Sequence, residues 1–299
     1  LRSASFDPAG RWVALARGAG AVSVRELSRG ALLGEARLGA AVVKRVAASL
    51  DGQRFVAATA ADPGVHSVTL ATMQAAPPLD IDEVLALKRV VAWDSPYGER
   101  FVASPYREGL YLFDDERLEE LLPSPALVDL SASPDRRRVV GLGQNGEVRE
   151  RGGDRRRVPR GHQPFALAVA ISNRGELAFA FRDRVSWEQE DGTVRRWSMD
   201  LTPLDLAFDA AGGRLAVGTR EGAVALYARS GQLVALVDDA HDRVPWVGFA
   251  PDGRLGAASW DGSLRFYALG VLERSPEALV AAAERAWGLT LAEVLRPRD

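Results

Sequence analysis

The chain has 299 residues, a hydrophobic content of 47% and a formal net charge of −2, so it can build a core and has no overall charge that would draw it to nucleic acid or an anionic membrane. It contains no cysteine, which excludes disulfides and thiolate metal sites. It has no run of about 18 apolar residues and no visible signal peptide, so we expect no membrane span and a cytoplasmic location.

One pattern of strand, turn, strand, turn and strand recurs along the chain. Its clearest copy has a Pro-Asp-Gly turn at residues 250–253 and an Asp-Gly turn at residues 261–262. A glycine or its substitute closes the first turn of each copy, at intervals of 37 to 46 residues. A period near 40 residues predicts a radial or stacked array of small sheets. We place these turn residues at Gly10, Gly52, Gly98, Arg136, Gly175, Gly212 and Gly253.

An apolar strand precedes each turn, and a second strand rich in Val, Ala, Leu and Phe follows it. The first strands are mostly apolar on both faces, as expected for inner strands packed between neighbours. Turn residues at this spacing, with β-branched and aromatic strands between them, predict an all-β protein. The predicted inner strands are residues 42–47, 88–93, 127–132, 166–171, 204–208 and 244–249.

This pattern resembles the WD-repeat (WD40-like) family of β-propellers, in a divergent bacterial form, over about residues 1–269. The resemblance rests on the two turns above and on the pair Gly161-His162, whereas Tyr267-Ala268 stands where the family has Trp-Asp. It implies a seven-bladed β-propeller over residues 1–270, and it implies that His241, Ser259, Asp261 and Tyr267 form a scaffold network in the last repeat.

In that family the N-terminus of the chain supplies the outermost strand of the last blade. Leu1 already begins an inner strand here, so we expect the closing strand either upstream of Leu1 or after Gly270. An unpaired edge would be an aggregation hazard. We therefore expect this chain to be the C-terminal domain of a larger bacterial signalling or defence protein.

The last segment, residues 271–299, predicts a short helical tail. Ser275-Pro276-Glu277 provides a hydroxyl cap, a proline at the first helical position and an acid in the first turn. We expect this tail to pack on the propeller, because so short a helix is marginal alone. The alternative is a free helix that binds a partner.

The chain offers little for catalysis. Its three histidines, His66, His162 and His241, fall in different repeats, so we expect no catalytic residue, no metal and no cofactor. The alternative is a metal-dependent propeller hydrolase or lyase that uses Asp129 and Asp205 on inner strands of separate blades.

Arginine is concentrated between residues 136 and 160, where nine arginines face three acids. One interpretation is a docking patch for an acidic partner or for phosphates. The other is a set of solvated outer strands and turns, which is the usual place for a charge run. No aromatic residues are interleaved among these arginines, so we do not expect nucleic acid as a partner.

We predict a non-catalytic protein-interaction or sensing module, with a purely structural cap on a fused or associated effector domain as a further option. The expected partner is a protein with an acidic or phosphorylated surface, bound by exposed Arg, Tyr and Trp at the channel mouth. The predicted partner-binding residues are Arg17, Lys44, Arg45, Lys88, Arg89, Tyr106, Arg107, Arg182, Arg184, Arg220, Trp246 and Trp260.

Overall fold

A computed structural model gives the structure of the chain. It describes residues 1–18, 20–60, 64–76, 87–95, 98–105, 110–113, 118–122, 127–144, 146–151 and 166–273, together with residue 281. Within these residues the protein is all-β and propeller-like, with seven antiparallel sheets and one 3-10 turn, η1 (Leu269–Glu273). No helix of the described part is long and apolar enough to cross a membrane.

Each sheet is formed by consecutive strands, so every connection within a sheet is a hairpin. The first sheet comprises β1 (Ser3–Phe6), β2 (Trp12–Arg17), β3 (Ala21–Glu26) and β4 (Leu32–Arg37). The second comprises β5 (Val43–Ala48), β6 (Arg54–Thr59), β7 (Val65–Thr69) and β8 (Gln74–Ala75). The third comprises β9 (Leu87–Ser95), β10 (Gly98–Pro105), β11 (Leu110–Phe113) and β12 (Leu118–Leu122).

The remaining four sheets repeat the same order. The fourth comprises β13 (Leu127–Ala132), β14 (Val139–Gly143) and β15 (Val148–Arg151). The fifth comprises β16 (Ala168–Ile171), β17 (Leu177–Ala180), β18 (Arg184–Glu188) and β19 (Val194–Ser198). The sixth comprises β20 (Pro203–Phe208), β21 (Arg214–Thr219), β22 (Val224–Ala228) and β23 (Leu233–Val237), and the seventh comprises β24 (Trp246–Phe249), β25 (Leu255–Ala258) and β26 (Leu264–Tyr267).

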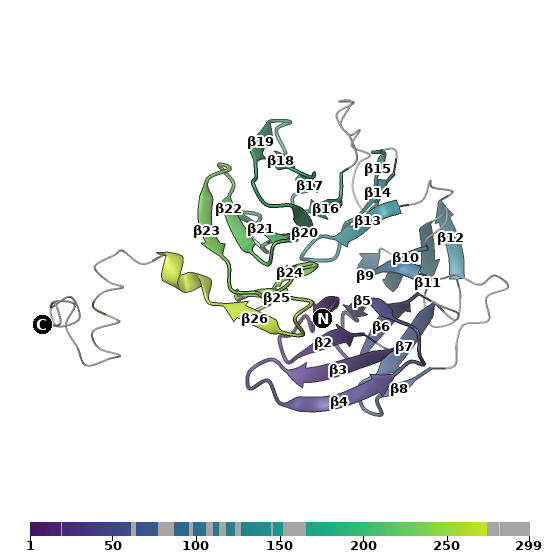
Figure 1. Ribbon diagram of the computed structural model, residues 1–299. Coiled ribbons are helices and arrows are strands. Elements are labelled where there is room, and N and C mark those ends of the chain that lie inside the picture. Colours follow the sequence, from purple (N-terminus) through teal and green to yellow (C-terminus); the bar gives the residue numbers. More distant parts are fainter. Residues whose placement is uncertain are drawn as a thin grey trace, which may run out of the picture.

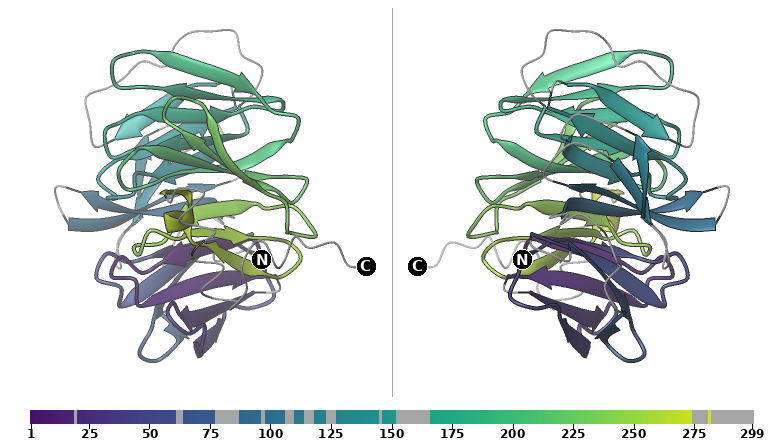
Figure 2. Two further views of the ribbon diagram at one scale, coloured as in Figure 1. Left: turned by 90° about the vertical axis from the view of Figure 1, so that its left-hand side faces the viewer. Right: turned by 90° about the vertical axis from the view of Figure 1, so that its right-hand side faces the viewer.

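The sheets are arranged around an axis, with the first strand of each nearest the centre (Figure 1). These innermost strands contact one another in chain order, from β1 through β5, β9, β13, β16 and β20 to β24. The last one, β24, also contacts β1, and the side views show these two ends of the chain of sheets lying together (Figure 2). The inner strands predicted from the sequence therefore occupy the predicted place, each within a few residues of its predicted bounds.

Six of the seven predicted turn residues close the first turn of their sheet. Gly10, Gly52, Arg136, Gly175, Gly212 and Gly253 all have φ between +60° and +84°, and each donates its N–H to the carbonyl three residues earlier. Glycine adopts such a φ without steric cost, which explains the regular spacing. Gly98 also stands at the first turn of its sheet, but it pairs with Ser95 and already begins β10.

Apolar contacts between adjacent sheets make the core. Between the fifth and sixth sheets, for example, the fully buried Trp187 meets Phe208 edge-on, with ring centroids 4.9 Å apart. Burying such a side chain contributes roughly 2–3 kcal/mol. The core is thus divided into clusters between neighbouring sheets, as expected when each sheet is apolar on both faces.

The seventh sheet has three strands in the described part of the chain. The predicted helical tail after residue 274 lies outside the described residues. The pair Gly161-His162, on which part of the resemblance rests, lies outside them too.

Candidate functional site at the axis and the channel mouth

One residue from each innermost strand lies at the same level near one end of the axis. In six sheets it stands seven residues before the turn residue, and Arg89 takes the corresponding place in the third sheet. All but Ala168 line an axial cavity of about 750 Å³. We call this set the charged ring: Ser3, Arg45, Arg89, Asp129, Ala168, Asp205 and Trp246.

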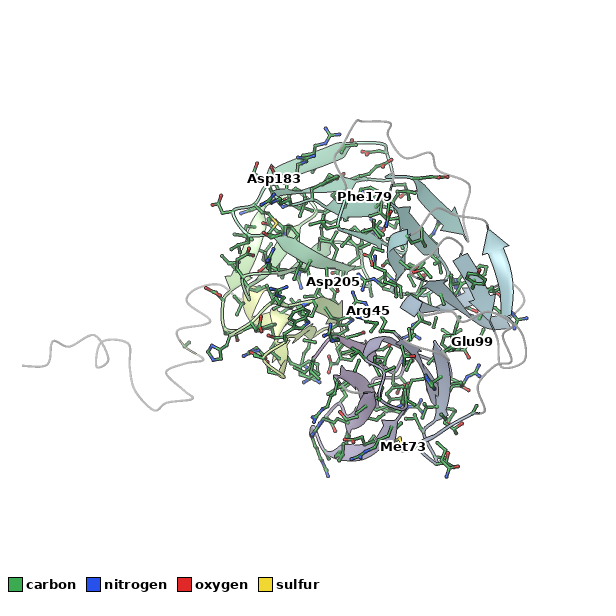
Figure 3. The ribbon with its side chains drawn as sticks, turned by 45° about the vertical axis from the view of Figure 1, so that its right-hand side comes forward. Arg45, Met73, Glu99, Phe179, Asp183 and Asp205 are labelled. Carbon is green, nitrogen blue, oxygen red and sulfur yellow. The ribbon has the colours of Figure 1, made fainter. Side chains whose placement is uncertain are left out.

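Arg45 reaches across the axis from β5. Its guanidinium donates to the carbonyl oxygens of Arg2 (3.3 Å) and Pro245 (3.2 Å) and to a carboxylate oxygen of Asp205 (3.4 Å). One side chain of the second sheet thereby contacts the first, seventh and sixth sheets. Figure 3 shows Arg45 and Asp205 near the centre, where the sheets converge.

The expectation that Arg45 belongs to an exposed docking surface is wrong. Only 8% of the residue is exposed, because its guanidinium lies among the inner strands and is bonded to the carbonyls of Arg2 and Pro245. A substitution such as Arg45→Glu would therefore leave a buried acid beside Asp205 and would report on folding rather than on partner binding.

The two carboxylates of the charged ring connect neighbouring inner strands. Asp129 accepts hydrogen bonds from Nε of Arg89 at 2.6 Å and from the N–H of Val169 at 2.9 Å. Asp205 accepts from Arg45 and from the N–H of Val247 at 2.9 Å. Each carboxylate therefore joins its own strand to the next one.

This geometry does not favour a divalent cation between Asp129 and Asp205. Every carboxylate oxygen of the pair already accepts a hydrogen bond, and a guanidinium lies against each carboxylate. The described residues contain no group of three or more His, Cys, Asp or Glu side chains that could hold a metal ion. The alternative of a metal-dependent enzyme thus gains no support from the arrangement of its two proposed ligands.

Burial shifts the ionisation of the cross-axis pair. It raises the pKa of Asp205 to about 6, even though Arg45 and the N–H of Val247 favour the charged carboxylate. Burial, together with repulsion from Arg89, lowers the pKa of Arg45 to about 10. The charged ring therefore combines desolvated cations with a carboxyl group that gains a proton in mildly acidic solution.

A second arginine occupies the opposite end of the axis. Arg136, in the turn between β13 and β14, donates through its guanidinium to the carbonyl oxygens of Phe6 and Ala48. These carbonyls end β1 and β5, so the fourth sheet is tied to the first and second. Burial lowers the pKa of Arg136 to about 10.

The inward direction of Arg136 bears on whether the arginine-rich stretch of residues 136–160 is a docking patch. Arg136 is directed inward, Arg138 lies 2.7 Å from Glu150, and only Arg137 of the three is exposed. The first three arginines of the stretch therefore offer little docking surface. Those between residues 152 and 160 lie outside the described part.

Small side chains surround the axis between its two ends. Two residues beyond the charged ring, each inner strand has a residue no larger than valine that lines the cavity. The indole of Trp246 folds back over Gly248 and also meets Phe6 edge-on at 5.5 Å, so Trp246 packs between the first and seventh sheets. The small set is Ser5, Ala47, Val91, Ser131, Ala170, Ala207 and Gly248.

Four of the other predicted partner-binding residues share one face. All four are exposed and lie at the turn from the second to the third strand: Arg17 is the last residue of β2, and Arg182, Arg220 and Trp260 follow the second strands of their sheets. Antiparallel hairpins place these turns at the same end of every sheet. We call this the turn face.

The remaining predictions have mixed outcomes. Arg184 is half-buried, stacks over Phe181 at 4.5 Å and pairs with Asp183 at 3.3 Å. Lys44 and Lys88 are half-buried as well, and Lys88 donates to the carbonyl of Leu127. Tyr106 and Arg107 lie outside the described residues.

Trp260 has two cationic neighbours that the sequence analysis missed. The guanidinium of Arg243 lies 4.6 Å and that of Arg2 lies 5.1 Å from the centroid of its ring. Trp260 as a whole residue keeps 41% of its surface exposed. Arg2 comes from the other end of the chain, so no local pattern could have linked it to Trp260.

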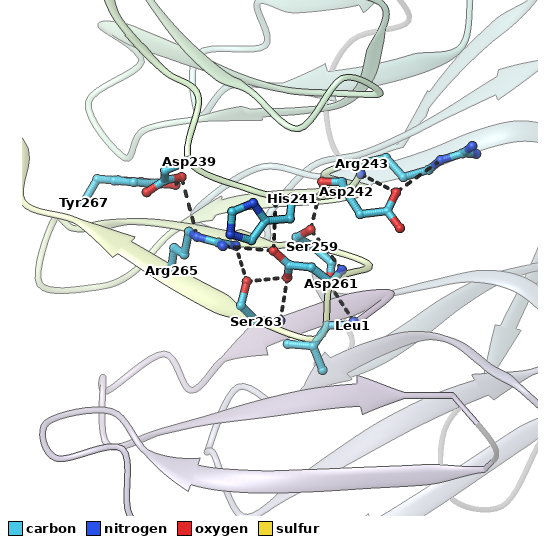
Figure 4. Close-up of polar contacts among 10 residues, drawn as sticks. All are labelled: Leu1, Asp239, His241, Asp242, Arg243, Ser259, Asp261, Ser263, Arg265 and Tyr267. Atoms are coloured by element: carbon cyan, nitrogen blue, oxygen red, sulfur yellow. Dashed lines mark hydrogen bonds and ion pairs between the residues drawn. The ribbon is translucent and has the colours of Figure 1, made fainter.

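The scaffold network predicted around Asp261 exists in a changed form (Figure 4). Asp261 accepts hydrogen bonds from the backbone N–H of His241, from Ser263 and from Arg265, and its backbone N–H donates to the hydroxyl of Ser259. The fourth predicted member, Tyr267, instead donates to Asp239 at 2.7 Å. Arg265 joins the two parts, because it also lies 3.5 Å from Asp239.

Comparison with known proteins supports the fold but indicates no function. No family model matches the chain, and no curated protein matches it. Among solved structures it is similar to a chain of Kuenenia stuttgartiensis hydrazine synthase, with a TM-score of 0.72 and 15% identity over 89% of this chain and 94% of that one. This likeness supports a propeller-like arrangement of the sheets. At such low identity it carries no catalytic residue across.

Proposed function

We propose that this chain is a non-catalytic protein-interaction module whose turn face binds an acidic protein surface. The observation that carries the proposal is the recurrence of exposed Arg17, Arg182, Arg220 and Trp260 at one turn position in four sheets. Arginine and tryptophan are the residues most often found at energetic hot spots of interfaces. A phosphorylated surface would satisfy the same guanidinium groups.

We further propose that the seven sheets are the blades of a closed, WD40-like propeller. The contact between β24 and β1 supports closure, and so does the hydrogen bond from the amino group of Leu1 to the carbonyl of Ser259 at 2.6 Å. The repeated turn glycines and the polar network of Asp261 support the WD40-like character. A fused effector domain and a cytoplasmic location stay predictions.

A closed ring gives the turn face its rigidity. Because every turn is anchored by two paired strands, the arginines and Trp260 are held before a partner arrives, which reduces the ordering cost of binding. Trp260 gains most from this, since its ring is already flanked by Arg2 and Arg243.

The test uses a fluorescent glutamate-rich peptide, its phosphoserine counterpart and a glutamine version, with binding followed by anisotropy. We expect the two acidic peptides to bind and the glutamine version to fail. Trp260→Ala and Arg220→Ala should each weaken binding by about tenfold, which is the usual loss at a hot spot.

The matched control is Arg174→Ala. Arg174 is also exposed, but it lies in the turn between β16 and β17, at the opposite end of the sheets. Its replacement should leave peptide affinity unchanged. Equal losses from Arg174→Ala and Arg220→Ala would reject the turn face as the binding surface.

A further inference from the structure

Together with the neighbouring Lys88, the charged ring carries one more positive than negative charge. Arg45, Arg89 and Lys88 bring three cationic groups to this end of the axis, against the carboxylates of Asp129 and Asp205. One carboxylate oxygen of Asp205 already accepts a hydrogen bond from the backbone N–H of Val247. The other carboxylate oxygen of Asp205 is 3.4 Å from Arg45. An unbalanced cation in a desolvated place is costly, so this region would gain from an additional anion.

The guanidinium groups of Arg45 and Arg89 also have N–H donors that are unused or weakly bonded. Arg89 uses Nε for Asp129, whereas its two terminal nitrogens have no hydrogen-bond partner in the described part of the chain. The three contacts of Arg45 measure 3.2 to 3.4 Å, which is long beside the roughly 2.7–2.9 Å of a strong charge-assisted hydrogen bond. Both groups could therefore turn donors toward a further acceptor.

The two guanidiniums come from adjacent inner strands, β5 and β9, and line the same cavity. Repulsion from Arg89 contributes to the lowered pKa of Arg45, as expected for like charges that share a desolvated space. The side chain of Arg89 is 18% accessible, so solvent reaches it from outside. Small residues such as Ser131 leave room beneath the ring, and a hydroxyl there can donate to an anion.

From these contacts we propose that the axial cavity binds a small oxyanion of the phosphate or carboxylate kind between Arg45 and Arg89. The anion accepts hydrogen bonds from the unused nitrogens of Arg89 and from Arg45, and it offsets the repulsion between them. This site is distinct from the turn face and needs no protein partner. It would make the module responsive to a small molecule.

The experiment measures binding of inorganic phosphate to the whole chain by calorimetry, at constant ionic strength with chloride as the reference anion. We expect one saturable site in the wild-type protein. Arg89→Gln should weaken phosphate binding tenfold or more, because a charge-assisted pair of donors is lost. Arg89→Lys, which keeps the charge but not the fork, should give an intermediate loss.

Asp205→Asn gives the sharper prediction, because its effect has the opposite sign. It keeps an oxygen for the N–H of Val247 but removes the charge that competes for Arg45. We expect phosphate to bind about fivefold more tightly, as removal of one modest competing interaction implies. A merely structural role for Asp205 would not produce tighter binding.

A control separates this site from the exposed surface. Arg174→Gln makes the same change of charge at an exposed turn and should leave phosphate affinity unchanged. The proposal is overturned if the wild type shows no saturable site, if Arg174→Gln weakens binding as much as Arg89→Gln, or if Asp205→Asn weakens it. None of these results depends on whether the acidic peptides bind.

Discussion

The guanidinium of Arg45 and the carboxylate of Asp205 lie 3.4 Å apart, although 160 residues separate them in the chain and they belong to sheets that do not adjoin. At the other end of the axis Arg136 makes a similar cross-connection to Phe6 and Ala48. The sheets are therefore joined through the centre by two arginines, in addition to the apolar contacts between neighbours.

Asp205 should make stability depend on pH between about 4 and 6. Its pKa is raised from 3.8 to about 6 in the folded protein, so in this interval the folded chain holds a proton that the unfolded chain has lost. The contribution of Asp205 to the free energy of unfolding is therefore fully present at low pH, where the carboxyl is protonated in both states. It is lost as the pH rises through about 6. The shift corresponds to roughly 3 kcal/mol.

The measurement is urea unfolding of the wild type and Asp205→Asn at pH 4.5 and pH 7. The variant has no charge to desolvate, so its stability relative to the wild type should rise between the two pH values. An unchanged difference in unfolding free energy would show that Asp205 does not titrate in this range.

Arg136 should be costly to replace despite its unfavourable backbone. Arg136→Ala removes both cross-axis hydrogen bonds and should lower the free energy of unfolding by about 3 kcal/mol. Arg136→Gly loses the same bonds but relieves a non-glycine residue at φ 60°, so it should be about 1 kcal/mol more stable than Arg136→Ala. Urea unfolding of the three proteins measures both differences.

The neighbouring variant Arg137→Ala is the control, because that side chain is 74% exposed and should contribute little. If the alanine and glycine variants at position 136 are equally stable, the backbone argument fails. If both match the wild type, the cross-axis bonds contribute nothing.

Gly248→Ala should destabilise the contact between the first and seventh sheets. A Cβ at this position would lie 2.7 Å from the indole of Trp246, which would have to move away from Phe6. Such overpacking costs about 1–3 kcal/mol. Gly213→Ala is the matched control, since a Cβ there meets nothing within 4 Å. Thermal unfolding with tryptophan fluorescence should show a lower Tm for the first variant alone.

Asp261 should behave oppositely to Asp205 in acid. Burial would raise the pKa of Asp261, but hydrogen bonds from Arg265, Ser263 and the N–H of His241 hold it well below 3.8. Its contribution is therefore present above pH 4 and is lost as pH falls further. Asp261→Asn should cost about 1 kcal/mol at pH 7, after allowance for screening by solvent.

The check is the unfolding free energy of Asp261→Asn against the wild type at pH 7 and at pH 3, with the exposed Asp238→Asn as control. We expect the difference to shrink at the lower pH. A loss that stays constant with pH, or that Asp238→Asn reproduces, would contradict the role given to Asp261.

The local pattern of the sequence predicted the elements well, because it follows from backbone sterics. A glycine that closes each turn marks a positive φ, and the apolar strand before it marks an inner strand, so the sheets and their order were recoverable. Gly98 differs from the other turn residues in that it already belongs to β10 and pairs with Ser95. The exposure of Trp260 in its turn was also predicted and is confirmed.

The direction of the charged side chains was not recoverable in the same way. Arg45 and Arg17 both lie near a strand end in the sequence. In the structure, however, Arg45 is buried and lies across the axis, whereas Arg17 faces solvent. The sequence alone determined the repeat, the turn positions and the all-β character, since these depend on residues close together in the chain. Only the tertiary structure decided which arginines pair with Asp129, Asp205 and the strand carbonyls, because those contacts join residues from about 40 to 200 positions apart once the sheets converge.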